Sequence, residues 1–161
     1  MIKILTAVIF FLIFYSPITY AQEAVVDNQN ACLTETERKA FSFRALQTNY
    51  MVAALSCENM LEDYNVFINK FHSTFVENGE VLKKYFARCY GIKGRYNLDQ
   101  FVTILANKMS MFSLKDAKSF CKKSHDSILK CLNLEQSDFK KYDFNTLSNY
   151  KLDEVFPPRC E

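Results

Sequence analysis

Apolar side chains recur at every third or fourth position through most of the chain, and this spacing limits the fold more than any other feature. Between Thr34 and Cys57, for example, Phe43, Leu46 and Tyr50 fall on one face of a helix together with Cys57 itself. Only three glycines and two prolines follow residue 21, and no stretch alternates polar and apolar residues as a half-buried strand would. The sequence therefore predicts an all-α fold, an antiparallel bundle of about five helices around one core.

Capping residues and glycines set the expected helix boundaries. Thr34 and Glu37 have the spacing of a capping box, so the first helix should open at Thr34 and reach Cys57. Gly79 and Gly91 are predicted to end the second and third helices, because glycine adopts positive φ at little cost. The other helices are expected over 59–78, 80–90, 97–112 and 113–132, with a short helical piece near 137–150 before an irregular tail.

Residues 1–21 have the layout of a secretory signal peptide. Lys3 precedes the apolar run "ILTAVIFFLIFYSPI", and Thr19 and Ala21 supply the small residues that signal peptidase reads. The apolar run has about 15 residues, fewer than the ~20 that cross a bilayer, and no later stretch is apolar enough to span one. We expect cleavage near Ala21 and a periplasmic or secreted protein without a transmembrane anchor. A loose leader over 22–33 should precede a single helical domain over 34–161.

The charge balance argues against a nucleic-acid partner. The whole chain has 20 basic and 18 acidic residues, and removal of the signal peptide with its Lys3 brings the two numbers within one of each other. A nearly neutral chain lacks the long-range positive field that dominates binding to nucleic acids. We therefore expect no nucleic-acid partner.

Six cysteines follow the predicted cleavage point: Cys32, Cys57, Cys89, Cys121, Cys131 and Cys160. An even number in an oxidising compartment favours disulfides, with 15 pairings open. Cys57 with Cys121 is the best pair because both lie on the inner faces of predicted helices, and Cys32 with Cys160 and Cys89 with Cys131 would complete the set. No C-x-x-C pair occurs, and the only histidines are His72 and His125, so neither a metal site nor a cofactor is expected.

Five ordered motifs carry a resemblance: "RALQTNYMVAALSC", "YNVFINKF", "LKKYFARCYG", "LDQFVTILANKMS" and "SFC". Over about residues 43–121, the chain resembles a group of small exported helical proteins predicted in alphaproteobacteria. Two cysteines that recur in that group match Cys57 and Cys121, whereas the other four cysteines and the tail after Leu132 depart from its pattern. The resemblance implies an exported helical protein and no particular mechanism.

The stretch "LKKYFARCYGIKGRY" is the main candidate contact site. Its cations and tyrosines could meet lipid phosphates, lipopolysaccharide phosphates or acidic sugars: Lys83, Lys84, Arg88, Lys93, Arg95, Tyr90 and Tyr96. The alternative is that the cations complement the dipole at the end of a helix while the tyrosines are half-buried. The expected partner is an anionic envelope component or another protein.

Recognisable catalytic motifs are absent, so the sequence favours a non-enzymatic role and no catalytic residue is assigned. His72 and His125 are interpreted as structural or surface residues. Glu58, Glu62 and Asp63 could serve a cell-wall hydrolase, but acidic residues are also favoured in the first turn of a helix. The leading hypothesis is a disulfide-stabilised binding or structural module; the second is a carrier of a small apolar ligand in the helical core, and the hydrolase is third.

Three asparagines within predicted helices were the remaining candidates: Asn65, Asn69 and Asn107. Polar side chains in helical cores can fix packing register through hydrogen bonds, and we expect these asparagines to form a core network. A ligand pocket lined by phenylalanine and tyrosine would use the same residue types.

Overall fold

The computed structural model describes residues 32–142, 144, 150 and 152–158, and helices dominate this part of the chain. The longer helices are α2 (Glu35–Ser56), α3 (Met60–Lys70), α4 (His72–Tyr90), α5 (Gly94–Lys115) and α6 (Ala117–Leu132). Shorter ones are η1 (Gly91–Lys93), α7 (Gln136–Phe139) and η3 (Leu152–Glu154). The predicted all-α class with five principal helices is thus confirmed for the described residues.

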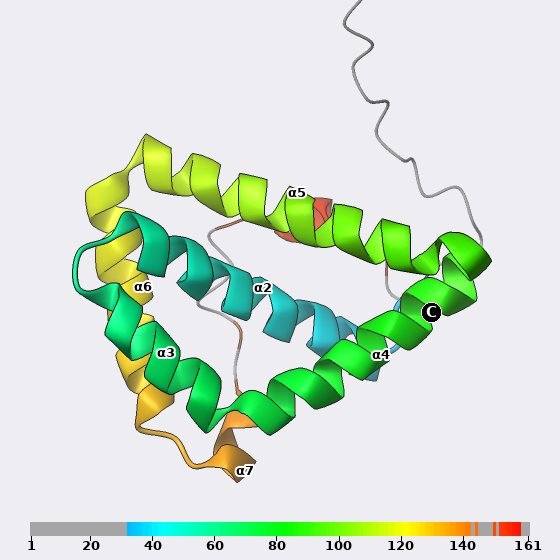
Figure 1. The fold of residues 1–161 in the computed structure, drawn as a ribbon, viewed down its shortest axis with the longest axis horizontal. Coiled ribbons are helices and arrows are strands. Elements are labelled where there is room, and N and C mark those ends of the chain that lie inside the picture. Colours follow the sequence, from blue (N-terminus) through cyan, green and yellow to red (C-terminus); the bar gives the residue numbers. More distant parts are fainter. Residues whose placement is uncertain (1–31, 143, 145–149, 151, 159–161) are drawn as a thin grey trace, which may run out of the picture.

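Helix α2 lies in the middle of the molecule, and α3, α4, α5 and α6 surround it (Figure 1). All four of these helices contact α2. A helix in such a position must be buried on several sides, whereas a surface helix buries a single stripe. This explains why the buried residues of α2 are spread around its axis: Ala40, Phe41, Phe43, Ala45, Leu46, Thr48, Asn49, Tyr50, Val52 and Ala53.

The helices are only partly antiparallel. In Figure 1, α4 runs against α2, whereas α5 runs in the same direction as α2. Helix α6 crosses α2 in the opposite sense, because Cys57 near the end of α2 meets Cys121 while Tyr50 meets Cys131 farther along α6. The frame of surrounding helices therefore differs from a simple up-and-down bundle.

The predicted start of the first helix is confirmed, whereas the predicted end of the second helix is wrong. Thr34 accepts a hydrogen bond from the Glu37 backbone while the Glu37 carboxylate accepts from the Thr34 backbone, which is the predicted capping box. The predicted helix over 59–78 is instead divided at Phe71, between α3 and α4, and Gly79 lies inside α4. Phe71 is fully buried and stacks on Phe139 with 3.8 Å between ring centroids, so packing sets this turn. A glycine inside a helix costs only about 1 kcal/mol, which the fold tolerates.

Two later boundaries also shift. Helix α5 begins at Gly94 rather than near Asn97, and α6 begins after Asp116, whose side chain accepts a hydrogen bond from the Ser119 backbone. Ser113 therefore belongs to α5. Gly91 ends α4 at a positive φ of 55°, as predicted from its freedom in this region.

Aromatic rings fill much of the core around α2. Phe41 contacts the rings of Tyr85, Phe86 and Phe101, with centroids 5.1, 5.8 and 4.7 Å away. At the other end of the molecule, Phe67 packs against Phe71, Phe75 and Phe139 in the same way. None of the helices in the described segments is both long and apolar enough to cross a membrane.

Candidate functional site

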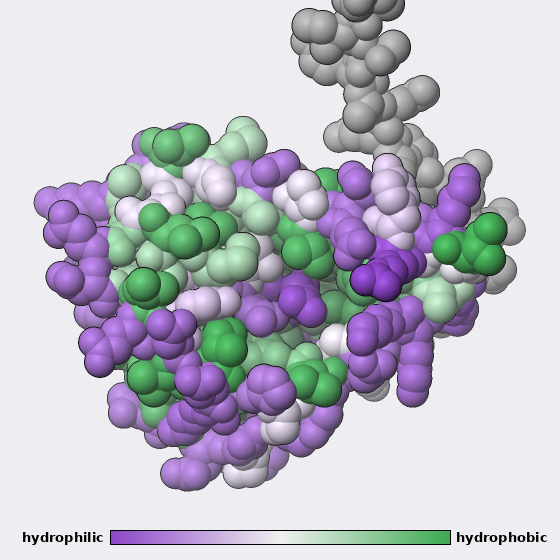
Figure 2. Space-filling view, viewed as in Figure 1, coloured by the Kyte–Doolittle hydropathy of each residue, from purple (hydrophilic) through white to green (hydrophobic). Residues whose placement is uncertain are grey.

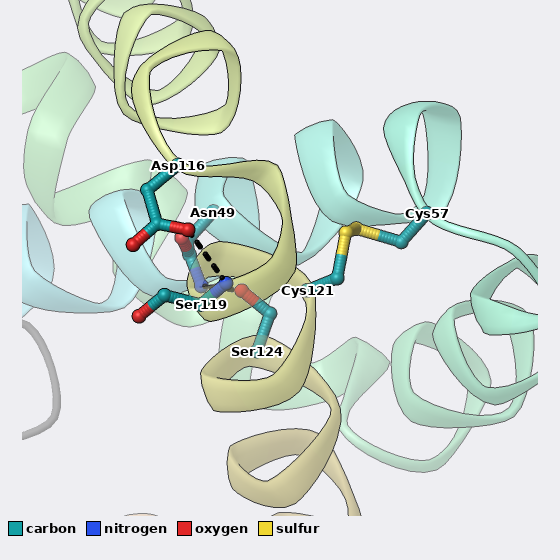
Figure 3. Close-up of a disulfide and its surroundings, with 6 residues drawn as sticks. All are labelled: Asn49, Cys57, Asp116, Ser119, Cys121 and Ser124. Atoms are coloured by element: carbon teal, nitrogen blue, oxygen red, sulfur yellow. Dashed lines mark hydrogen bonds between the residues drawn. A yellow bond between two sulfur atoms is a disulfide. The ribbon is translucent and has the colours of Figure 1, made fainter.

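Cys57 and Cys121 form a disulfide, as the sequence predicted (Figure 3). Cys57 caps the end of α2 and Cys121 lies in the second turn of α6, with 5.6 Å between their Cα atoms. The bond closes a loop of 64 residues and fastens α2 to α6. Its role is structural, because it constrains the unfolded chain and fixes where these two helices cross.

The predicted pairing of Cys89 with Cys131 is wrong. Both are buried thiols, Cys89 at the end of α4 and Cys131 at the end of α6. These helix ends lie at opposite sides of the molecule (Figure 1), whereas a disulfide requires Cα atoms within about 7 Å. Burial raises the pKa of the Cys131 thiol despite hydrogen bonds from Tyr50 and Tyr142, so Cys131 is held protonated and is a poor nucleophile.

Cys32 is disulfide-bonded, and its predicted partner Cys160 lies outside the described residues. The Leu33 backbone donates a hydrogen bond of 2.7 Å to the carbonyl oxygen of Pro158. This contact brings the chain just after Cys32 beside the chain just before Cys160. The pairing of Cys32 with Cys160 stays a prediction, and this contact supports it.

The predicted contact site lies at the corner where α4 ends, η1 turns and α5 begins, which we call the α4–α5 corner (residues 83–96). Gly94 makes this corner tight. A Cβ atom on Gly94 would lie 2.8 Å from the Phe86 carbonyl oxygen and 2.9 Å from the Ala87 backbone. Since both neighbours are backbone atoms, only glycine lets α5 start this close to α4.

The five predicted cations are all exposed at this corner, but they differ in their partners. Lys83 pairs with Glu80 at 2.6 Å, and Arg88 pairs with Glu37 at 2.8 Å. The remaining cations form no salt bridge with any residue in the part of the chain that the structure describes: Lys84, Lys93 and Arg95. The structure thus separates two cations with structural partners from three whose charge faces solvent.

The two predicted tyrosines have different environments. Tyr90 is half-buried and stacks on Phe86, whereas Tyr96 is 62% exposed. Between them, the side chain of Ile92 is fully exposed at the tip of the corner. A surface hollow of about 570 Å³ lies beside this tip, lined by Lys83, Ala87, Gly94, Arg95, Leu98 and Asp99. Figure 2 shows apolar surface flanked by hydrophilic residues at this end of the molecule.

The residues considered for catalysis lie on the surface. His72 and His125 are exposed, and the Nε2 atom of His125 lies 3.4 Å from the Asp63 carboxylate. Glu58 and Glu62 are also exposed to solvent. Within the described ranges, no group of three histidine, cysteine, aspartate or glutamate residues could hold a metal ion.

The predicted core network of asparagines is wrong, because the three asparagines lie outside the core. Asn65, Asn69 and Asn107 are all exposed. The buried network instead joins α2 to α6, where the Tyr50 hydroxyl lies 2.6 Å from Ser127 Oγ. Asn49 Nδ2 donates to Ser124 Oγ at 3.3 Å, and Figure 3 shows these two residues. Tyr50 was predicted to be buried, but its polar partners on α6 follow from the crossing of the two helices, which the sequence pattern does not specify.

Arg44 is a second feature that the sequence pattern did not reveal. It lies half-buried in the middle of α2, and its Nε atom is fully buried without a hydrogen-bond partner among the residues that the structure describes. Its position in the sequence is that of an ordinary solvent-facing arginine, so no local signal distinguishes it.

No protein-family model matches the chain, and neither a curated protein nor a solved structure gives a significant match.

Proposed function

We propose that this chain is an exported, disulfide-stabilised binding module and that its α4–α5 corner contacts phosphate-bearing lipid headgroups of the cell envelope. The observation that carries the proposal is the combination, at one corner, of the fully exposed Ile92 with three cations that form no salt bridge to any described residue. The Cys57–Cys121 disulfide supports an oxidising compartment, as does the predicted signal peptide.

The chemistry of the tip suits the boundary between water and lipid. Lys84, Lys93 and Arg95 can each contribute about 1 kcal/mol near an anionic membrane surface. Burial of the Ile92 side chain in the interfacial region contributes about 1.5 to 3 kcal/mol. Tyr96 presents an apolar ring with a polar hydroxyl, as tyrosines at membrane interfaces do. A total of roughly 5 kcal/mol corresponds to weak, reversible association.

The rigidity of the corner reduces the entropic cost of binding. Gly94 allows direct contact between the two helices, and Arg88 ties the end of α4 to Glu37 at the beginning of α2. The binding groups are therefore already ordered before contact, so little conformational entropy is lost on binding.

Flotation with phospholipid vesicles tests the proposal. The full chain without its signal peptide should float with vesicles that contain phosphatidylglycerol and stay behind with pure phosphatidylcholine vesicles. Replacing Lys84, Lys93 and Arg95 with glutamate should abolish flotation, and Ile92→Ser should weaken it. The matched control replaces three exposed lysines of α6 with glutamate, namely Lys122, Lys123 and Lys130. Equal loss in the control, or unchanged flotation of the corner variant, would contradict the proposed site.

A further inference from the structure

Arg44 lacks an acidic partner in the part of the chain that the structure describes. Its Nη1 atom donates to Gln47 Oε1 at 2.9 Å, and that acceptor is neutral. Arg88 and Lys140 reach carboxylates on separate helices, Glu37 and Glu77, whereas Lys70 donates to the carbonyl oxygen of Leu132. A partly buried charge without an opposite charge costs free energy, and this cost falls when an anion binds.

The guanidinium of Arg44 lies between three helices. Gly79 of α4 lies beside it, because a Cβ atom added there would stand 3.8 Å from Nη2, an ordinary contact distance. Tyr64 of α3 is half-buried nearby: burial raises the pKa of its hydroxyl, and the positive charge of Arg44 opposes that rise. Burial in turn lowers the pKa of Arg44. The surroundings of the charge are therefore the neutral polar groups of Gln47 and Tyr64.

An apolar stripe begins beside this charge. Arg44, Gln47, Met51 and Leu55 follow each other at steps of three and four residues, so they share one side of α2. None of them is fully covered by other helices, and Leu55 is 78% exposed. We call this side, defined by these four residues, the open side of α2. From Arg44 to Leu55 it extends roughly 16 Å, at 1.5 Å per residue.

Helix α5 lies alongside α2 and carries further exposed apolar residues along its own length: Ile104, Met111 and Leu114. In Figure 2, apolar surface gathers over the parts of α2 and α5 nearest their C-terminal ends, and hydrophilic groups lie over the middle of α2. The surface therefore combines one positive charge with an elongated apolar area.

We propose that the open side of α2 binds an amphipathic monocarboxylate, with its head group on Arg44 and its alkyl chain along Met51 and Leu55. The planar guanidinium can donate two parallel hydrogen bonds to a carboxylate through its terminal nitrogens, which lie beyond the fully buried Nε atom. The single positive charge of Arg44, among the neutral groups of Gln47 and Tyr64, matches a ligand with a single negative charge. This places the ligand on the surface of α2, outside the aromatic core.

Isothermal titration of the folded full chain with dodecanoate, below the concentration at which it forms micelles, tests this site. The wild type should bind about one equivalent, and Arg44→Met should weaken binding by about tenfold or more, the value of a charge-assisted hydrogen bond. Leu55→Asn changes an exposed residue, so its fold is secure, and it should also weaken binding. Gly79→Leu should block the space beside the guanidinium.

The control is Lys123→Met, which removes an exposed cation of α6 outside both proposed sites and should leave dodecanoate binding unchanged. Dodecanol, which has the same chain without a charge, should bind more weakly than dodecanoate. Absence of dodecanoate binding to the wild type, equal affinity in Arg44→Met, or an equal loss in Lys123→Met would each overturn the assignment. Vesicle flotation by the corner is unaffected by Arg44→Met in this account, so the two proposals fail independently.

Discussion

The two sides of α2 that carry polar residues meet different surroundings. Toward α6, Tyr50 reaches Ser127 and Asn49 reaches Ser124, and the Cys57–Cys121 bond lies at the end of the same contact. We call this the covered side. On the open side, the Arg44 side chain has Gln47 as its only hydrogen-bond partner among the described residues. Each side has one buried polar atom without such a partner, Asn49 Oδ1 on the covered side and Arg44 Nε on the open side, but within the described part of the chain only the open side has a charge without a carboxylate. We infer that polar groups on the covered side specify how α2 packs on α6, whereas the charge on the open side serves recognition.

Loss of the disulfide on the covered side should have the largest effect. Replacing both Cys57 and Cys121 with serine should lower the free energy of unfolding by about 2 to 4 kcal/mol, because the unfolded chain regains the entropy of a 64-residue loop. Urea denaturation without reductant measures this change. Replacing both with alanine separates loss of the bond from the added hydroxyl groups. A loss below about 0.5 kcal/mol would show that the helices hold this contact without the bond.

Removal of the Tyr50 hydroxyl should have the next largest effect. Tyr50→Phe should lower the free energy of unfolding by about 1 to 2 kcal/mol, because Ser127 and Cys131 lose a buried hydrogen-bond partner. Tyr96→Phe is the matched control, since Tyr96 is largely exposed and should change stability little. Similar free energies of unfolding for the two variants in urea denaturation would show that the buried network does not stabilise the fold.

Glu37 tests how much a carboxylate partner contributes to an arginine, because Arg88 has this partner and Arg44 has none among the described residues. Burial raises the pKa of Glu37, but hydrogen bonds from the Thr34 backbone and from Arg88 outweigh this and hold its pKa below the usual value. A lowered pKa stabilises the fold at pH values above the usual pKa of a carboxyl group. This stabilisation is lost as the pH falls through the pKa of the folded state. Glu37→Gln should therefore cost about 0.5 to 1 kcal/mol at pH 7, with the difference from wild type disappearing in acid. A difference that is constant from pH 7 to acid would contradict the ionic contribution.

Removal of the Arg44 charge should have the smallest effect on stability. Arg44→Met keeps a long apolar side chain and removes a half-buried charge without a carboxylate partner, so the free energy of unfolding should change by less than about 0.5 kcal/mol or increase. Thermal denaturation at neutral pH gives the sign. A clear decrease would mean that Arg44 supports the fold in the way that Tyr50 does.

The sequence predicted those parts of the fold that depend on local physics. The capping box at Thr34, the end of α4 at Gly91 and the inner position of Cys57 all follow from residue type and spacing. The turn at Phe71 could not be predicted in this way, because it depends on stacking against Phe139, far along the chain. Gly79 was also misleading, because it lies inside α4, where a glycine costs only about 1 kcal/mol.

The candidate sites were predicted to different extents. The α4–α5 corner was visible in the sequence because its cations and tyrosines lie close together. Only the structure shows that Arg88 pairs with Glu37 whereas Arg95 forms no salt bridge to a described residue. The open side of α2 could not be predicted from the sequence, because its exposure depends on where the neighbouring helices pack around α2. The spacing of Arg44, Met51 and Leu55 identifies a shared face, and only the fold shows that this face is left uncovered.

One measurement tests the division between the two sides of α2 most directly: the melting temperature of wild type, Tyr50→Phe and Arg44→Met, each with and without dodecanoate. We predict that Tyr50→Phe melts earlier but is stabilised by dodecanoate as the wild type is, and that Arg44→Met melts no earlier but gains nothing from dodecanoate. An Arg44→Met protein that melts earlier and is still stabilised by dodecanoate would contradict this division.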